Sequence, residues 1–165
     1  MIKHKTVRIL AIAPLSRGLG YAVMEGPDKL VVCGNKAILR DKNAGALAWV
    51  NRFIQFYQPD VLVLPNVTAI DTRRGARIKT LHRQIVAWAD KKKVKVRLVS
   101  VTQVRTQLLR DSKGTKFAVA QMLASKYPTE LGLRLPPKRR PWMSEDPRMD
   151  IFDAVSLAVA FWERR

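Results

Sequence analysis

Acidic residues are scarce in this sequence. Its 165 residues include 13 Asp and Glu against 31 Lys and Arg, which gives a formal net charge of +18. A small domain needs a net charge of only about 2 to 8 to stay in solution, and a larger surplus repels itself unless a polyanion neutralises it. The composition therefore predicts a nucleic-acid partner, because Lys and Arg side chains that contact phosphates release condensed counterions.

Cysteine and long apolar segments are also lacking. Cys33 is the single cysteine, which excludes an internal disulfide and a zinc site built from cysteines. The apolar run at 7–13 is far too short to cross a bilayer, and no basic amphipathic terminal helix indicates binding to a membrane surface. We therefore expect a cytoplasmic protein with no membrane partner.

The order of apolar patterns predicts an α/β fold. Segments 7–13 (ended by Pro14), 19–24 and 29–35 are short and apolar, with turn residues between them, so they predict an antiparallel three-strand meander. Residues 60–64 (DVLVL) form a continuous apolar run, as in a parallel strand that is covered on both faces. A fifth strand is predicted at 94–99.

Helical spacing of apolar residues occurs between and after the later strands. It predicts helices at about 41–57 (capped by Asp41), 72–91, 101–109, 115–127 and 147–163. Strands followed by helices in this order form βαβ crossovers, which predicts a five-stranded mixed sheet with helices on both faces. No linker or break in composition divides the chain, so we expect residues 1–165 to form a single domain.

The basic residues cluster along the chain more clearly than the acids do. They gather on the second helix, before the fourth helix and before the last helix, where few acids are available to pair with them. Contacts of this kind position a phosphate backbone rather than read its sequence. The candidate nucleic-acid contacts are Arg17, Arg73, Arg74, Arg77, Lys79, Arg83, Lys113, Lys116, Lys138, Arg139 and Arg140.

Two further side chains near these groups have competing interpretations. His82 lies on the Arg-rich second helix, which favours a phosphate contact over a role as a catalytic base. Trp142 follows the last basic group, and packing against the core is favoured over stacking on an unpaired base. No Gly-rich phosphate loop and no Ser-His-Asp arrangement can be assembled.

The last helix carries the best candidates for a metal site. Asp150 and Asp153 are three residues apart and therefore lie on one face of the helix near its start. Metal-dependent phosphodiester cleavage needs several such carboxylates around two divalent ions. The same two acids could instead cap the helix and complement its dipole, which is the favoured interpretation without other evidence.

Three segments resemble the RuvC-type Holliday-junction resolvases. Their first strand is similar to RILAIAPLSRGLGYAV (8–23), their fourth strand to PDVLVLPNV (59–67), and their last helix to MDIFDAVSLAVAF (149–161). Residues 102–105 and the helix that contains Lys116 match in order. The resemblance implies a ribonuclease-H-like fold, and it also implies that the protein forms a homodimer.

The resemblance also implies where the metal ligands should lie. The essential acids of the family fall on Ala13, Pro65, Asp150 and Asp153, so half of the expected ligands are missing. In that family the first acid bridges both metals, and its replacement by Ala13 predicts that cleavage is lost or impaired.

Three functional hypotheses follow. The first is a catalytically degenerate relative that binds branched or duplex DNA and needs no cofactor. The second is an active Mg²⁺- or Mn²⁺-dependent, structure-selective endonuclease that uses Asp150, Asp153 and a relocated acid such as Asp71 or Glu145. The third is a non-catalytic assembly subunit that uses its positive charge to bind RNA or a protein partner.

Overall fold

A mixed five-stranded sheet forms the centre of the molecule. The computed structural model describes residues 6–68, 75–111 and 113–163. The strands are β1 (Arg8–Leu15), β2 (Gly18–Glu25), β3 (Leu30–Ala37), β4 (Val61–Pro65) and β5 (Lys95–Val99), in the spatial order β3-β2-β1-β4-β5. β1, β2 and β3 pair antiparallel, whereas β4 runs parallel to both β1 and β5. The predicted α/β fold with its N-terminal meander is confirmed.

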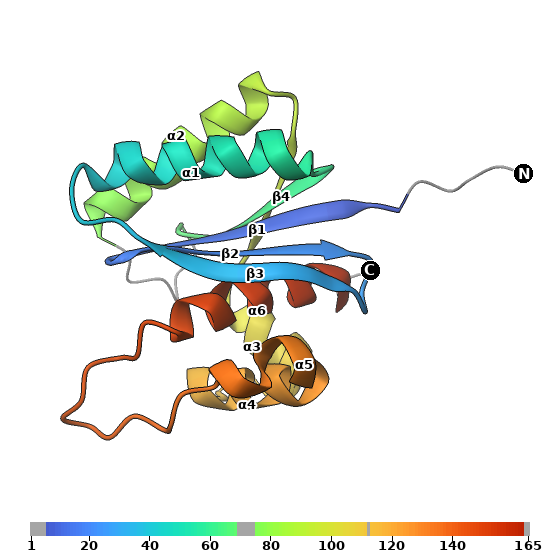
Figure 1. Cartoon of the computed structure of the whole chain (residues 1–165), viewed down its shortest axis with the longest axis vertical. Helices are drawn as coiled ribbons and strands as arrows, with labels where there is room; N and C mark the ends of the chain where they lie inside the picture. Colours follow the sequence, from blue (N-terminus) through green and yellow to red (C-terminus); the bar gives the residue numbers. More distant parts are fainter. Residues whose placement is uncertain (1–5, 69–74, 112, 164–165) are drawn as a thin grey trace, which may run out of the picture.

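Helices cover both faces of this sheet, as predicted (Figure 1). One face carries α1 (Lys42–Tyr57) and α2 (Ala76–Lys91). The other face carries α6 (Met149–Glu163), and outside it lie α3 (Val101–Leu109), α4 (Lys116–Lys126), α5 (Pro128–Leu131) and a 3₁₀ turn at Gly132–Arg134. Within the described residues, no helix is both long and apolar enough to span a membrane.

The alternation of side chains along β1 divides the core in two. Leu10 and Ile12 pack with residues of α1 and α2 on one face. Ile9, Ala11 and Ala13 pack with residues of α6, α3 and α4 on the other. Residues 9–14 of β1 are therefore all buried, on both faces of the sheet, which explains why this apolar stretch shows no alternation.

Several element boundaries differ from the predictions. β1 continues through Pro14 to Leu15, still paired with β2. Its pairing with β4 ends at Ala11, so beyond that residue one side of β1 is an edge, where a proline is tolerated. Asp41 precedes α1 in a left-handed conformation, and its side chain makes no capping hydrogen bond within the described helix. The short α5 and the 3₁₀ turn were not predicted, and residues 72–74 lie outside the described part.

Gly20 allows the last helix to lie directly on the sheet. It pairs with Ala13 across β1 and β2, and a Cβ atom built on it would overlap the backbone carbonyl of Asp150. The start of α6 can therefore approach β2 only because residue 20 has no side chain. This close approach sets the position of Asp150, which is 3% exposed.

We expect Gly20→Ala to destabilise the fold by about 2–3 kcal/mol, because the added methyl group meets helix backbone that cannot move without repacking the core. Urea denaturation of the wild type and the variant measures this difference. Gly132→Ala is the control, since nothing lies within 4 Å of a Cβ atom there. Equal losses for the two variants would contradict the assigned role of Gly20.

Candidate functional site

A cavity of about 170 Å³ opens at the carboxyl ends of β1, β4 and β5. Ligands of open α/β sheets bind at this edge. The wall consists mainly of apolar side chains from the strand ends and from α3, α4 and α6, with three charged residues among them. The lining residues are Ala13, Leu15, Pro65, Val99, Val101, Val104, Arg105, Lys116, Val119, Phe152, Asp153, Ser156 and Leu157.

Three carboxylates lie together at the start of α6. Asp150 and Asp153 belong to the first turns of this helix, and Glu145 belongs to the loop that precedes it. One oxygen from each of the three lies within 4.8 Å of the others. We call Glu145, Asp150 and Asp153 the carboxylate cluster.

Two cations bind this cluster from other elements. Lys116 Nζ lies 2.7 Å from Glu145 Oε1 and 2.9 Å from Asp153 Oδ2. Arg17 Nη2 lies 3.0 Å from Asp150 Oδ1, and Arg17 Nη1 donates a hydrogen bond of 2.8 Å to the backbone oxygen of Glu145. The three negative charges are therefore largely compensated inside the protein.

The local chain explains where these cations come from. Arg17 lies in the turn between β1 and β2, and Lys116 is the first residue of α4. The hydroxyl of Thr115 accepts a hydrogen bond of 3.1 Å from the backbone nitrogen of Ala118, so it caps this helix and fixes its start beside the cluster.

Burial and charge act on the ionisation of this cluster in opposite directions. Burial raises the pKa of Asp150 above its ordinary value, and the Arg17 guanidinium only partly offsets this effect. Burial opposes the charged form of Lys116, but the carboxylates of Asp153 and Glu145 outweigh it and raise the pKa of Lys116. Lys116 is therefore a cation at neutral pH.

The donor set of the cluster is suited to a hard divalent ion such as Mg²⁺ or Mn²⁺, because it consists of carboxylate oxygens. Cleavage by two metals needs further acidic ligands that converge on both ions. Ala13 and Pro65 line the cavity beside Asp153 but have no side-chain donor. The described residues therefore fit one divalent ion and do not fit the pair.

Three of the predicted nucleic-acid contacts also have partners inside the protein, and their contact with nucleic acid stays a prediction. Arg17 and Lys116 bind the carboxylate cluster, and Arg77 Nη1 donates a hydrogen bond of 2.9 Å to Asn43 Oδ1. His82 is only 7% exposed and burial lowers its pKa, so the predicted phosphate contact is wrong. The sequence carried a signal for this burial, because His82 lies four residues after Ile78 and three before Ile85, and both isoleucines are on the buried face of α2.

The remaining predicted contacts are exposed wherever the structure describes them. Lys79 and Arg83 are exposed on α2, and Lys113 is exposed before α4. The three basic residues before the last helix, at 138–140, are exposed as well. Arg73, Arg74 and the alternative acid Asp71 lie outside the described residues.

Glu145 is one of the two relocated acids that the sequence offers for an active endonuclease. The structure places it in the carboxylate cluster, where its side chain is 34% exposed. A signal was present, because four of the 13 acids of the chain fall between residues 145 and 153. The pairing of Arg17 with Asp150, 133 residues apart, had no such signal.

The mixed five-stranded sheet with its helices has the same overall fold as several solved Holliday junction resolvases. Thermus thermophilus RuvC aligns with a TM-score of 0.69 at 19% identity over 96% of each chain. The fowlpox virus resolvase, solved with substrate Holliday junction DNA, aligns with a TM-score of 0.63 at 14% identity over 96% of this chain and 98% of that one.

A third resolvase, the yeast mitochondrial Ydc2, aligns with a TM-score of 0.60 at 14% identity. The alignment covers 98% of this chain and 79% of Ydc2. No protein-family model matches the chain, and no curated protein matches it. At these identities the likeness is one of fold.

We expect Lys116→Met to lower the free energy of unfolding by about 1–2 kcal/mol, because it leaves Glu145 and Asp153 close together without their shared cation. The loss is smaller than for a fully buried pair, since the Lys116 side chain is 38% exposed. Urea denaturation of Lys116→Met, Asp153→Asn and the double variant measures the coupling. Lys113→Met is the control for lysine removal, and strictly additive losses would contradict the pairing.

Millimolar Mn²⁺ should raise the melting temperature of Lys116→Met more than that of the wild type, because the variant presents carboxylates without a competing ammonium group. Thermal unfolding with and without Mn²⁺ measures the difference. Adding Asp150→Asn to the variant should reduce the gain. An equal response of the wild type and Lys116→Met would contradict competition between the lysine and a metal.

Proposed function

We propose that this protein binds branched or duplex DNA and that metal-dependent phosphodiester cleavage is lost or impaired in it. The observation that carries this proposal is the apolar cavity at the strand ends. Ala13 and Pro65 lie in its wall beside Asp153, and they are the two positions at which the resemblance to resolvases requires acids. A phosphate that enters there meets one carboxylate of the expected set, the cations Arg105 and Lys116, and several aliphatic side chains.

The charge distribution supports binding of a polyanion. The net charge is +18, and exposed cations lie on α2, before α4 and before α6. The carboxylate cluster does not oppose an approaching phosphate strongly, because Lys116 and Arg17 neutralise most of its charge. Attraction therefore acts over much of the surface, and its strength should fall steeply with salt concentration.

The fold neighbours support DNA as the nucleic acid. Thermus thermophilus RuvC has been solved in complex with a Holliday junction substrate, and the fowlpox virus resolvase with its substrate junction DNA. The RuvC of that complex aligns with 93% of this chain at a TM-score of 0.67, so the two share a fold. A four-way junction is therefore the first substrate to test, and a homodimer remains a prediction.

The second candidate function is an active endonuclease. The position of Glu145 favours it, because this acid joins Asp150 and Asp153 in a cluster that fits one divalent ion. Glu145, Asp150 and Asp153 would hold Mg²⁺ or Mn²⁺, which would supply Lewis-acid activation of the phosphodiester. Lys116 would have to leave the cluster or share it with the ion.

We expect the wild type to bind a labelled four-way junction without cutting it in Mg²⁺ or Mn²⁺, since Ala13 and Pro65 supply no ligand. Gel mobility and cleavage are scored together, with a matched linear duplex as the comparison. The variant Ala13→Asp with Pro65→Glu restores the missing acids and should gain cleavage. Asp153→Asn added to it is the matched control and should abolish that gain.

Cleavage by the wild type that disappears in Asp153→Asn would overturn the loss of catalysis and establish the second function. Failure to bind either DNA would overturn both functions and leave the subunit that binds RNA or a protein. The same gel shift with a single-stranded RNA of matched length then separates these last two.

A further inference from the structure

Eight consecutive residues project from the molecule between the 3₁₀ turn and α6. Every residue from 137 to 144 is exposed, and none of them belongs to a helix or strand. Figure 1 shows this segment extending away from the body at the lower left. We call residues 137–144 the arm.

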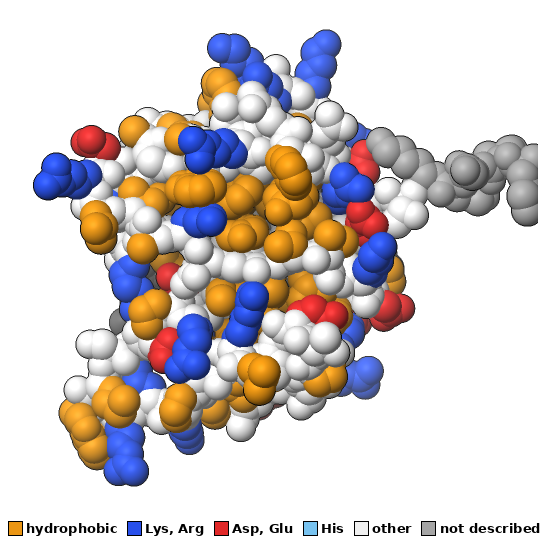
Figure 2. All heavy atoms as spheres, viewed as in Figure 1, with side chains coloured by type: hydrophobic (Ala, Val, Ile, Leu, Met, Phe, Trp, Pro, Cys, Tyr) orange, Lys and Arg blue, Asp and Glu red, His pale blue; other side chains and the backbone are white. Residues whose placement is uncertain are grey.

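The arm combines an aromatic side chain with positive charge. Trp142 is 76% exposed and Met143 is 48% exposed, so the expectation that Trp142 packs against the core is wrong. The arm also contains Lys138, Arg139 and Arg140 and no acid. In Figure 2 hydrophobic side chains and Lys or Arg side chains occur together at the projecting corner where Figure 1 places the arm.

Hydrogen bonds and proline hold the tip of the arm in a turn. The backbone nitrogen of Met143 donates a hydrogen bond of 2.9 Å to the oxygen of Arg140, which places Pro141 and Trp142 at the centre of the turn. Arg139 Nη1 donates a hydrogen bond of 3.2 Å to the oxygen of Met143. Trp142 is therefore presented on a preorganised tip, which reduces the entropy lost when it binds a partner.

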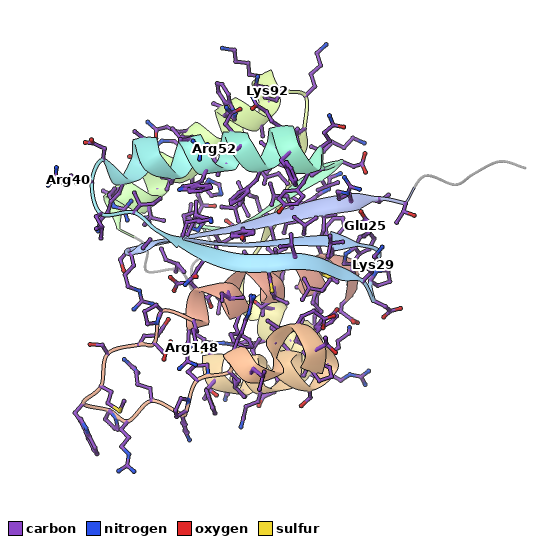
Figure 3. The ribbon with its side chains drawn as sticks, in the orientation of Figure 1. Glu25, Lys29, Arg40, Arg52, Lys92 and Arg148 are labelled. Carbon is purple, nitrogen blue, oxygen red and sulfur yellow. The ribbon has the colours of Figure 1, made fainter. Side chains whose placement is uncertain are left out.

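Both ends of the arm are held by the body of the protein, and its C-terminal end is held at the candidate site. At its start, Leu135 packs against the core beneath the sheet. At its end, Glu145 binds Lys116 and its backbone oxygen accepts a hydrogen bond from Arg17. Arg148, labelled in Figure 3, lies where the chain enters α6 and binds Asp146 at 2.7 Å. The acids next to the arm are therefore paired and do not cancel its charge.

We propose that the arm binds an unpaired base of a nucleic acid, with Trp142 stacked on the base and Lys138, Arg139 and Arg140 on the adjoining phosphates. The positive charge of the arm favours a nucleic acid as its partner, because three exposed cations lie within four residues of the exposed ring and can bind phosphates. The Arg140 guanidinium lies 5.6 Å from the Trp142 ring centroid, which leaves the other face of the indole to a base. An intact duplex offers no such face, since its bases are stacked.

This inference rests on the proposed nucleic-acid binding and specifies which feature of the ligand is recognised. The test compares three labelled DNAs: a continuous duplex, the same duplex with one unpaired adenine, and one of its single strands. Trp142→Ala should weaken binding to the last two about 10-fold, because the variant has no ring to stack on the base. Binding to the continuous duplex should change less than about twofold, and Trp142→Phe should retain most of the affinity for the bulge.

Two further variants separate stacking from charge. Phe56→Ala removes a side chain that is 79% exposed on α1 and should leave all three affinities unchanged. Replacing Lys138, Arg139 and Arg140 with Gln should weaken binding to all three DNAs alike. It should also reduce the slope of log affinity against log salt by about one for each phosphate that the protein no longer binds.

The outcomes are distinguishable. Absence of wild-type binding to any of these DNAs, or to the four-way junction, would overturn the proposed function together with this inference. Wild-type binding that Trp142→Ala leaves unchanged, or weakens equally on duplex and bulge, would overturn the inference alone. A dimer in sedimentation that becomes a monomer in Trp142→Ala would assign the arm to the interface between copies and would also overturn it.

Discussion

The candidate site depends on the packing of helix α6 against the sheet. Eleven of its 15 residues are buried, between β1 and β2 on one side and α3 and α4 on the other. Gly20 permits the first turn to approach β2 until backbone meets backbone. Because the helix cannot shift or rotate in this environment, Asp150 and Asp153 have fixed directions: Asp150 towards Arg17, and Asp153 towards Lys116 at the wall of the cavity.

The distribution of charge follows from this geometry. A chain with only 13 acids places four of them between residues 145 and 153, and each of the four has a basic partner at 3.0 Å or less. Arg148 binds Asp146 and lowers the pKa of that carboxyl to about 2. Lys116 and Arg17 bind the rest. Basic side chains of the protein itself therefore offset most of this local negative charge. The excess of Lys and Arg elsewhere remains available to an anionic partner.

Ala13 and Pro65 determine the chemistry of the same edge of the sheet. With carboxylates there, several negative charges would converge on the cavity and require cations to offset them. With Ala and Pro, the wall is mainly aliphatic and the carboxylate cluster is small enough for two side-chain cations to compensate. The aliphatic residues at positions 13 and 65 and the pairing of Lys116 are therefore two parts of one electrostatic arrangement, in which protein side chains hold the acids together.

The sequence by itself determined the sheet, its helical layers and the absence of acids at residues 13 and 65, because apolar periodicity and side-chain identity are local properties. It also indicated Asp150 and Asp153, since spacing along a helix defines its faces. Only the tertiary structure decided that Arg17 and Lys116 bind the carboxylate cluster and that Trp142 is exposed. These outcomes depend on which segments, some more than a hundred residues apart in the sequence, come into contact. The packing of the whole chain determines those contacts, and no local sequence pattern indicates them.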